Sequence, residues 1–131
     1  MPTLYLIRGV PGSGKSTLAR AIAQATHSAH LEADLFFMGL DGYRYDHKKI
    51  PEAHAWCQAR ALEYLKQGQD VAVANTFSRI WEMQPYLDMG FPVVVIECKG
   101  NWPNIHGCPE ASIQKMRDRW EPFIATAQAT V

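Results

Sequence analysis

One eight-residue segment near the N-terminus constrains the fold of this chain more than any other feature. Residues Gly9–Ser16 read G-V-P-G-S-G-K-S and match the pattern G-x-x-x-x-G-K-[S/T]. The apolar run Leu4–Ile7 precedes this segment, and the helix-favouring stretch Thr17–Gln24 follows it. A strand, a glycine-rich turn and a helix N-terminus form a cradle in which backbone N–H groups and the helix dipole hold phosphates. The sequence therefore predicts a loop that binds a nucleoside triphosphate.

The positions of this loop have distinct expected roles. Gly9, Gly12 and Gly14 allow backbone angles and close approaches that a side chain would block. Lys15 is expected to reach the β- and γ-phosphates, and the Ser16 hydroxyl is expected to ligate Mg²⁺. The predicted site for ATP comprises Gly9, Pro11, Gly12, Ser13, Gly14, Lys15, Ser16 and Thr17.

Length and composition limit the remaining possibilities. The 131 residues suffice for one domain with its own core, and we expect a single domain over residues 1–131. Thirteen basic and thirteen acidic residues cancel, so any surface that binds nucleic acid must be local. No segment approaches the roughly 20 apolar residues that a membrane span needs. Three widely spaced cysteines suggest reduced thiols, which fits a cytoplasmic location.

Apolar runs alternate with helical stretches along the chain. Leu4–Ile7, Val71–Ala74 and Val93–Ile96 have the character of buried parallel strands, and Ala29–Ala33 is a weaker fourth. This alternation predicts an α/β domain of the P-loop NTPase type, with helices on both faces of a parallel sheet.

Three helices are predicted after the second strand. Apolar spacing predicts one over 50–68 and a shorter one over 80–87 that Pro85 interrupts. The last is expected to begin near Pro109 and to place on one face Ile113, Met116, Trp120 and Phe123.

Polar residues that follow the strands are the candidates for chemistry, because ligands bind beyond the carboxyl ends of parallel strands. Asp34 follows the second strand and is expected to take a proton from an acceptor hydroxyl or to help hold Mg²⁺; a structural cap is the alternative. Asn75 and Arg79 follow the third strand, and Arg79 is expected to stabilise the moving phosphoryl group. The third strand ends in Ala74 without a carboxylate, which argues against a water-activating ATPase.

Two further segments have candidate roles. Tyr43, Arg44 and Tyr45 begin a basic, aromatic stretch that suits stacking a base and holding its phosphates; a solvated loop is the alternative. Residues 99–109 are punctuated by glycine and proline, and we expect them to form a short lid that excludes water.

The ordered set of motifs resembles the small P-loop kinases related to phage polynucleotide kinase, within the polynucleotide-kinase-like AAA-family ATPases. The motifs that carry the resemblance are the segments 8–17, 33–37, 52–57, 75–76, 81–86, 104–107 and 113–117. The resemblance implies an adenylate-kinase-like sheet, transfer of the ATP γ-phosphate to a hydroxyl with Mg²⁺, and Asp34 as the base. Relatives phosphorylate 5′-hydroxyl ends of DNA or RNA, and some phage members phosphorylate 5-hydroxymethyluracil in DNA.

The chain departs from the family pattern at several positions. Ala74 replaces an aspartate that often precedes the Asn-Thr pair, and Leu35 replaces an aspartate after the matched base. Phe37 stands where phage polynucleotide kinase has an arginine, and the lid lacks its arginines as well. These changes weaken the 5′-end interpretation, because those arginines hold phosphates, so Arg79 or Arg44 would have to replace them.

Four functions remain open from the sequence. The leading hypothesis is a DNA kinase that acts on the hydroxymethyl group of 5-hydroxymethyluracil. A flipped base is expected to be received by the aromatic residues Phe36, Phe37, Tyr43 and Tyr45. A polynucleotide 5′-hydroxyl kinase is second. A small-molecule kinase is third, since the neutral charge does not demand a polyanionic substrate. A nucleotide switch or ATPase that transfers phosphate to no alcohol is fourth.

Overall fold

A computed structural model describes residues 1–39, 42–102, 107–123 and 128–130 of the chain. The N-terminal half contains β1 (Leu4–Arg8), α1 (Lys15–Thr26), β2 (Ala29–Leu31), the 3₁₀ turn η1 (Ala33–Phe37), β3 (Met38–Gly39) and β4 (Gly42–Tyr43). The remainder contains the 3₁₀ turn η2 (His47–Lys49), α2 (Ile50–Lys66), β5 (Val71–Asn75), α3 (Ile80–Leu87), β6 (Val93–Glu97), α4 (Glu110–Asp118) and β7 (Gln128–Thr130).

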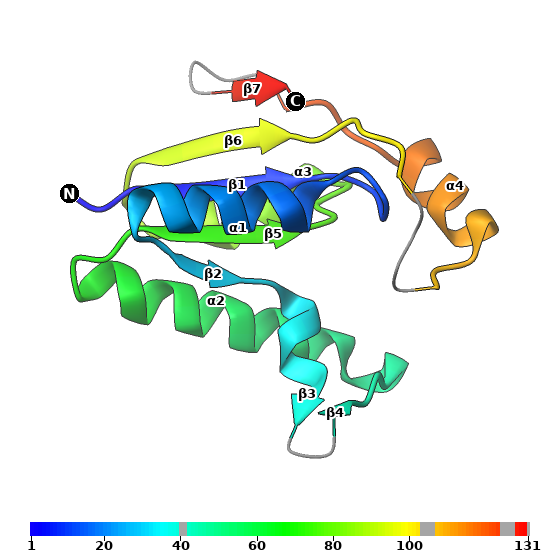
Figure 1. Ribbon diagram of the computed structural model, residues 1–131, viewed down its shortest axis with the longest axis horizontal. Helices are drawn as coiled ribbons and strands as arrows, with labels where there is room; N and C mark the ends of the chain where they lie inside the picture. Colours follow the sequence, from blue (N-terminus) through cyan, green and yellow to red (C-terminus); the bar gives the residue numbers. More distant parts are fainter. Residues whose placement is uncertain (40–41, 103–106, 124–127, 131) are drawn as a thin grey trace.

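The central sheet is parallel, with the strand order β2-β5-β1-β6-β7. Arg8, at the end of β1, is paired with Asn75 of β5 on one side and with Glu97 of β6 on the other. The carboxyl ends of these three strands therefore meet at one edge, where their arrowheads point together in Figure 1. The loop that follows β1 begins at this edge, which is the place that the sequence predicts for ligand binding.

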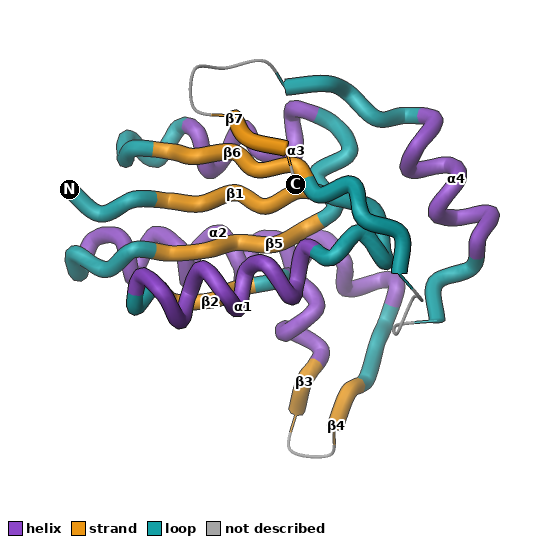
Figure 2. Tube along the Cα trace, turned by 45° about the horizontal axis from the view of Figure 1, so that its top comes forward, coloured by secondary structure: helices purple, strands orange, loops and turns teal. Residues whose placement is uncertain are grey.

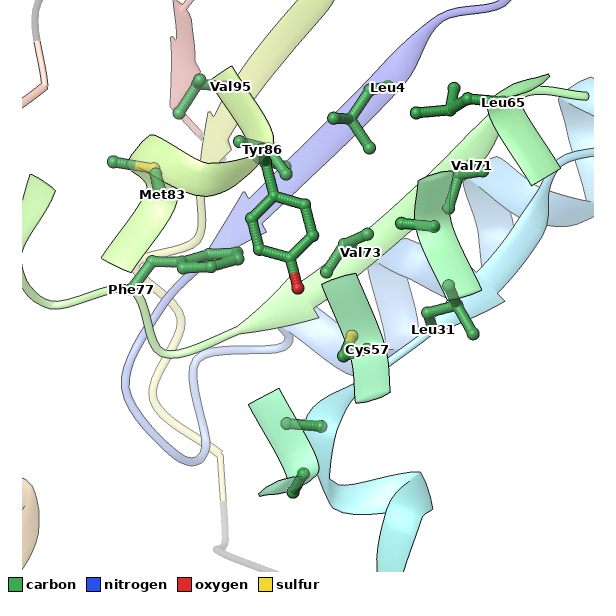
Figure 3. Close-up of a cluster of buried hydrophobic side chains, with 14 of the residues drawn as sticks. Leu4, Leu31, Cys57, Leu65, Val71, Val73, Phe77, Met83, Tyr86 and Val95 are labelled. Carbon is green, nitrogen blue, oxygen red and sulfur yellow. The ribbon is translucent and has the colours of Figure 1, made fainter. Parts of the chain in front are cut away.

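Two apolar clusters cover opposite faces of the sheet. On one face Ile7, Ala72 and Ala74 pack against Ala19 of α1. The other face is larger and packs against α2 and α3, which contribute buried residues including Cys57, Leu65, Met83 and Tyr86. Figure 3 shows Tyr86 between Phe77 and Val73, with its hydroxyl directed toward Cys57. Helices on both faces explain why β1 and β5 are almost continuously apolar, and they confirm the predicted fold class.

Several predicted boundaries are wrong. The weak second strand ends at Leu31 rather than Ala33, because residues 33–37 turn into η1. Helix α3 runs through Pro85 without interruption. Helix α4 ends at Asp118, so Trp120 and Phe123 lie beyond it rather than on its apolar face. The sheet also gains a fifth strand, β7, whose short polar sequence gives no strand signal.

A short hairpin projects from the carboxyl edge of the sheet. Strands β3 and β4 pair antiparallel, with Met38 opposite Tyr43. The hairpin follows η1 directly and extends away from the central sheet in Figures 1 and 2. Within the described part of the chain, no helix has the length and apolar character needed to cross a bilayer.

Candidate active site

The loop between β1 and α1 has the backbone shape that its glycines permit. Gly12 and Gly14 have φ angles of 84° and 93°, which are unfavourable for residues with a Cβ atom. A Cβ atom on Gly9 would collide with the Ser13 side chain. Helix α1 begins at Lys15, directly after Gly14, so the free N–H groups of its first turn lie at the end of the loop. These features match the predicted phosphate cradle.

The segment after β6 is hydrogen-bonded to this loop. The Trp102 N–H donates to the Gly12 carbonyl at 2.8 Å, and the Gly100 N–H donates to the Ser13 carbonyl at 3.1 Å. The Trp102 ring lies so close to Gly14 that a Cβ atom there would be 2.8 Å from its Cζ3 atom. Residues 100–102, the first part of the predicted lid, thus help to hold the phosphate loop in its shape. Residues 103–106 of that lid lie outside the described residues.

The Ser16 hydroxyl, the predicted Mg²⁺ ligand, contacts a carboxylate from the neighbouring strand end. Its Oγ donates to Glu32 Oε1 at 2.7 Å, and Glu32 Oε2 lies 2.7 Å from His30 Nε2. Burial opposes ionisation of Glu32, but hydrogen bonds from His30 and Ser16, together with the charges of His30 and Lys15, outweigh it and hold its pKa below the usual range. Glu32 is therefore a carboxylate beside the first turn of α1.

Lys15 lies in the same charged cluster. Burial lowers the pKa of its ammonium group, while the carboxylates of Glu32 and Asp34 raise it in part. The two acidic side chains that follow β2 are thus close enough to Lys15 to act on its charge. The structure brings together the predicted cation and the predicted base at one edge of the sheet.

A buried amide fixes the segment that carries Asp34. Asn75, at the end of β5, accepts a hydrogen bond from the Ala33 N–H at 2.9 Å through its Oδ1 atom. Its Nδ2 atom lies 3.9 Å from Cys57 Sγ in α2. The structure therefore gives Asn75 a positioning role next to Asp34, which itself lies in the first turn of η1 and is half-buried.

The predicted base-binding residues divide into a buried part and an exposed part. Phe37 is only 8% exposed and belongs to the core, where its ring centroid lies 5.2 Å from that of Tyr45. Tyr45 is 54% exposed. Arg44 is exposed, and its N–H donates to the Phe37 carbonyl at 2.9 Å. Tyr43 belongs to β4.

Arg79 lies at the start of α3, after β5. Its side chain is exposed, and its backbone N–H donates to Glu82 Oε2 at 2.8 Å. Arg79 is thus near the carboxyl edge of the sheet, and its catalytic role stays a prediction.

A second arginine lies directly behind the loop. Arg8 is fully buried, and its guanidinium donates to the carbonyls of Phe77 and Glu121 at 2.6 and 2.8 Å. Burial lowers its pKa, which the carboxylates of Glu97, Glu82 and Glu121 raise in part. The hydrogen-bond partners of its guanidinium are all backbone carbonyls. Arg8 therefore anchors the β1 end from which the loop departs.

Sequence reasoning gave no role to Glu32 or Trp102, and it did not find the partners of Arg8. Glu32 is two positions before the predicted base. Its spacing of two residues from His30 is the only local signal that the His30 and Glu32 side chains lie on the same face, toward α1. Trp102 was part of the predicted lid but had no assigned role. Arg8 gave no local sign of the distant carbonyls that it would bind.

The sequence profile of the family described as AAA domain matches residues 4–107. This chain belongs to the AAA domain family. Human NEDD4-binding protein 2 is 34% identical to it over 137 residues, which cover 93% of this chain and 8% of that protein. The 2′,3′-cyclic-nucleotide 3′-phosphodiesterase of Pongo abelii is 29% identical over 125 residues, which cover 91% of this chain and 28% of the relative. The chain thus spans less than a third of either relative.

Solved structures share the fold of this AAA domain. A putative kinase from Chloroflexus aurantiacus superposes with a TM-score of 0.73 at 18% identity, covering 99% of this chain and 87% of that one. A chain of the Pnkp1/Rnl/Hen1 RNA repair complex superposes with a TM-score of 0.63 at 21% identity, covering 94% and 40%. These likenesses confirm the predicted fold.

Proposed function

We propose that this AAA domain is an ATP-dependent phosphotransferase that transfers the γ-phosphate to a hydroxyl group on nucleic acid. The observation that carries the proposal is the meeting of the phosphate loop, Lys15 and Asp34 at one strand edge. A water-activating ATPase is disfavoured, because β5 ends in Ala74 and Asn75 and offers no pair of carboxylates there.

In the proposed reaction the acceptor hydroxyl oxygen attacks the γ-phosphorus while its proton passes to a carboxylate oxygen of Asp34. A new P–O bond forms to the acceptor, and the bond from the γ-phosphorus to the bridging oxygen breaks to release ADP. Lys15 stabilises the negative charge on the phosphate oxygens during this exchange. Trp102 and Gly100 hold the loop in shape through hydrogen bonds to the Gly12 and Ser13 carbonyls.

The residues present fit a magnesium ion. Mg²⁺ prefers oxygen ligands and keeps part of its coordination for waters and substrate phosphates. Ser16 supplies a hydroxyl oxygen here, and Glu32 adds a carboxylate 2.7 Å from it. Within the described residues no group of three or more His, Cys, Asp or Glu side chains would hold a metal by itself. When bound with ATP, the ion neutralises phosphate charge and so favours attack at phosphorus.

The surface beside Asp34 supports a nucleic-acid acceptor. The hairpin that leaves η1 leads into residues 44–49, all of them exposed, which include Arg44, Tyr45, Lys48 and Lys49. Basic side chains bind the phosphate backbone, and an exposed tyrosine ring is a platform for a base. This local concentration of positive charge stands out in a chain with no net charge.

For the acceptor itself we propose the hydroxymethyl group of 5-hydroxymethyluracil in DNA. The exposed Tyr45 ring, which contacts the buried Phe37 ring, would stack on an extruded base. A polynucleotide 5′-hydroxyl is the second candidate, favoured by the likeness to a chain of the RNA repair complex.

Incubation with γ-labelled ATP and Mg²⁺ tests these assignments. Three acceptors are offered in parallel: a duplex with 5-hydroxymethyluracil, a 5′-hydroxyl oligonucleotide and a pool of nucleosides and sugars. Label in the first confirms the full proposal, and label in the second confirms the second candidate. Label only in the small-molecule pool, or only in free phosphate, contradicts the nucleic-acid proposal.

A further inference from the structure

The register of the sheet places Glu32 next to the position where a strand-end carboxylate is missing. Strands β2 and β5 pair in parallel up to Leu31 opposite Val73. Glu32 is still extended, with φ −144° and ψ 143°, so one further step brings it beside Ala74. The carboxylate that β5 lacks is thus present one strand away.

Side-chain alternation puts both positions on the same face of the sheet. Leu31 and Val73 belong to the cluster on the α2 side, whereas Ala74 belongs to the cluster on the α1 side. Since successive side chains of a strand point to opposite faces, Glu32 points toward α1. Its hydrogen bond to Ser16, in the first turn of α1, agrees with this direction.

The direction of that hydrogen bond suits a cation site. A serine hydroxyl has one proton and two lone pairs. Because Ser16 donates its proton to Glu32, its lone pairs remain directed elsewhere and are available to a metal ion. The Glu32 side chain is only 13% exposed and is also held by His30, so its carboxylate has a fixed position.

We propose that Glu32 is the metal-positioning carboxylate of this site, replacing the carboxylate that β5 lacks at Ala74. It orients the Ser16 hydroxyl toward the ion and adds a negative charge beside it, as supporting groups around metal ligands do. This inference rests on the proposed function, since it requires that the loop binds a magnesium–nucleotide complex.

The test compares nucleotide binding with and without metal. Calorimetry measures the affinity for a non-hydrolysable ATP analogue in excess Mg²⁺ and in EDTA, for the wild type, Glu32→Gln and Glu52→Gln. Glu52 is an exposed glutamate at the start of α2, so its variant controls for the lost charge. Electron paramagnetic resonance then measures the affinity of each protein–analogue complex for Mn²⁺.

We expect Glu32→Gln to keep the EDTA affinity, to lose most of the gain that Mg²⁺ provides, and to bind Mn²⁺ roughly 10–100-fold more weakly. Glu52→Gln should match the wild type. Unchanged Mn²⁺ affinity in Glu32→Gln overturns the inference and leaves the proposed function intact. An equal loss of affinity with and without metal also overturns it, because Glu32 would then shape only the loop. If the wild type binds no nucleotide in Mg²⁺, the proposed function itself fails.

Moving the carboxylate from position 32 to position 74 tests whether the two neighbouring positions are equivalent. In the Glu32→Gln/Ala74→Asp variant the acidic group moves across to β5, on the same face of the sheet. If the double variant binds Mn²⁺ more tightly than Glu32→Gln does, positions 32 and 74 are equivalent for the carboxylate. If the double variant folds but binds Mn²⁺ no more tightly, they are not equivalent. Ala74 is buried, so thermal unfolding must first show that the double variant folds. If it does not fold, the Glu32→Gln comparison alone decides.

Discussion

The guanidinium carbon of Arg8 lies 4.1 Å from the centroid of the Trp120 ring. Arg8 is the last residue of β1, and Trp120 follows α4, so this contact joins the base of the phosphate loop to a segment far along the chain. The guanidinium also donates to the Glu121 carbonyl at 2.8 Å. Arg8 therefore couples the shape of the loop to the packing of the C-terminal part of the domain.

Replacing Arg8 with lysine should lower the free energy of unfolding by about 2–3 kcal/mol. A single ammonium group lacks the planar fork that reaches two carbonyls, so buried acceptors lose their partners. Guanidinium denaturation measures the change. Arg20→Lys, on the exposed side of α1, is the control and should leave stability unchanged. Equal stability of the Arg8 and Arg20 variants would contradict the anchoring role.

Lys15→Ala should abolish phosphoryl transfer while the circular dichroism spectrum stays that of the wild type. The activity is lost because Lys15 is the only basic residue in Gly9–Ser16, so no other side chain of the loop can stabilise the β- and γ-phosphates. Lys66→Ala, at the exposed end of α2, serves as the control. Turnover at the wild-type rate in Lys15→Ala would rule out the assignment of the phosphate site.

Asp34→Asn should preserve ATP binding and reduce transfer by roughly 10²–10⁴-fold, the range for loss of a general base. The amide keeps the shape of the side chain but does not accept the acceptor's proton. Single-turnover assays with labelled ATP measure the rate, and calorimetry measures binding. A variant as active as the wild type would show that Asp34 is structural.

Gly14→Ala should weaken nucleotide binding, because it disturbs both the loop and the Trp102 ring. A φ angle of 93° strains alanine by about 1–2 kcal/mol, and the new Cβ atom would be 2.8 Å from Trp102 Cζ3. Gly68→Ala is a matched control, since Gly68 has a φ angle of 84° with no atom within 4 Å of a Cβ atom. Both variants should lose stability, and only Gly14→Ala should lose affinity. Similar affinities for the two would show that the Trp102 contact is unimportant for binding.

The free energy of unfolding should fall as the pH is lowered from 7.5 to 5.5, in part through His54. Burial lowers the pKa of His54 in the folded protein, and Glu82 raises it only in part. Below an unfolded pKa of about 6.5 the unfolded chain takes up a proton that the folded chain resists, so acid favours unfolding. Chemical denaturation at both pH values measures the free energy of unfolding. Its decrease between pH 7.5 and pH 5.5 should be smaller in His54→Gln than in the wild type. An identical decrease in the two proteins would contradict the assignment to His54.

The sequence alone determined the parts of this protein that depend on neighbours along the chain. The phosphate loop Gly9–Ser16 combines a local motif with local strand and helix signals, and the apolar period of α2 marks the residues that are buried. Alternating strands and helices were enough to predict the fold class. Asp34 was predicted as a site residue because it follows a strand in a fold whose ligands lie beyond strand ends.

Only the tertiary structure decided the contacts between distant segments. Pairing of β2 with β5 set Glu32 beside Ala74, and folding of the β6 end onto the loop set Trp102 against Gly14. Trp120 has the spacing of a helical core residue, yet α4 ends at Asp118 and its ring packs on Arg8 instead. The physical reason is that periodicity reports how one segment is buried. Which atoms then meet depends on the order of the strands and on how each loop closes, and no local pattern contains that information.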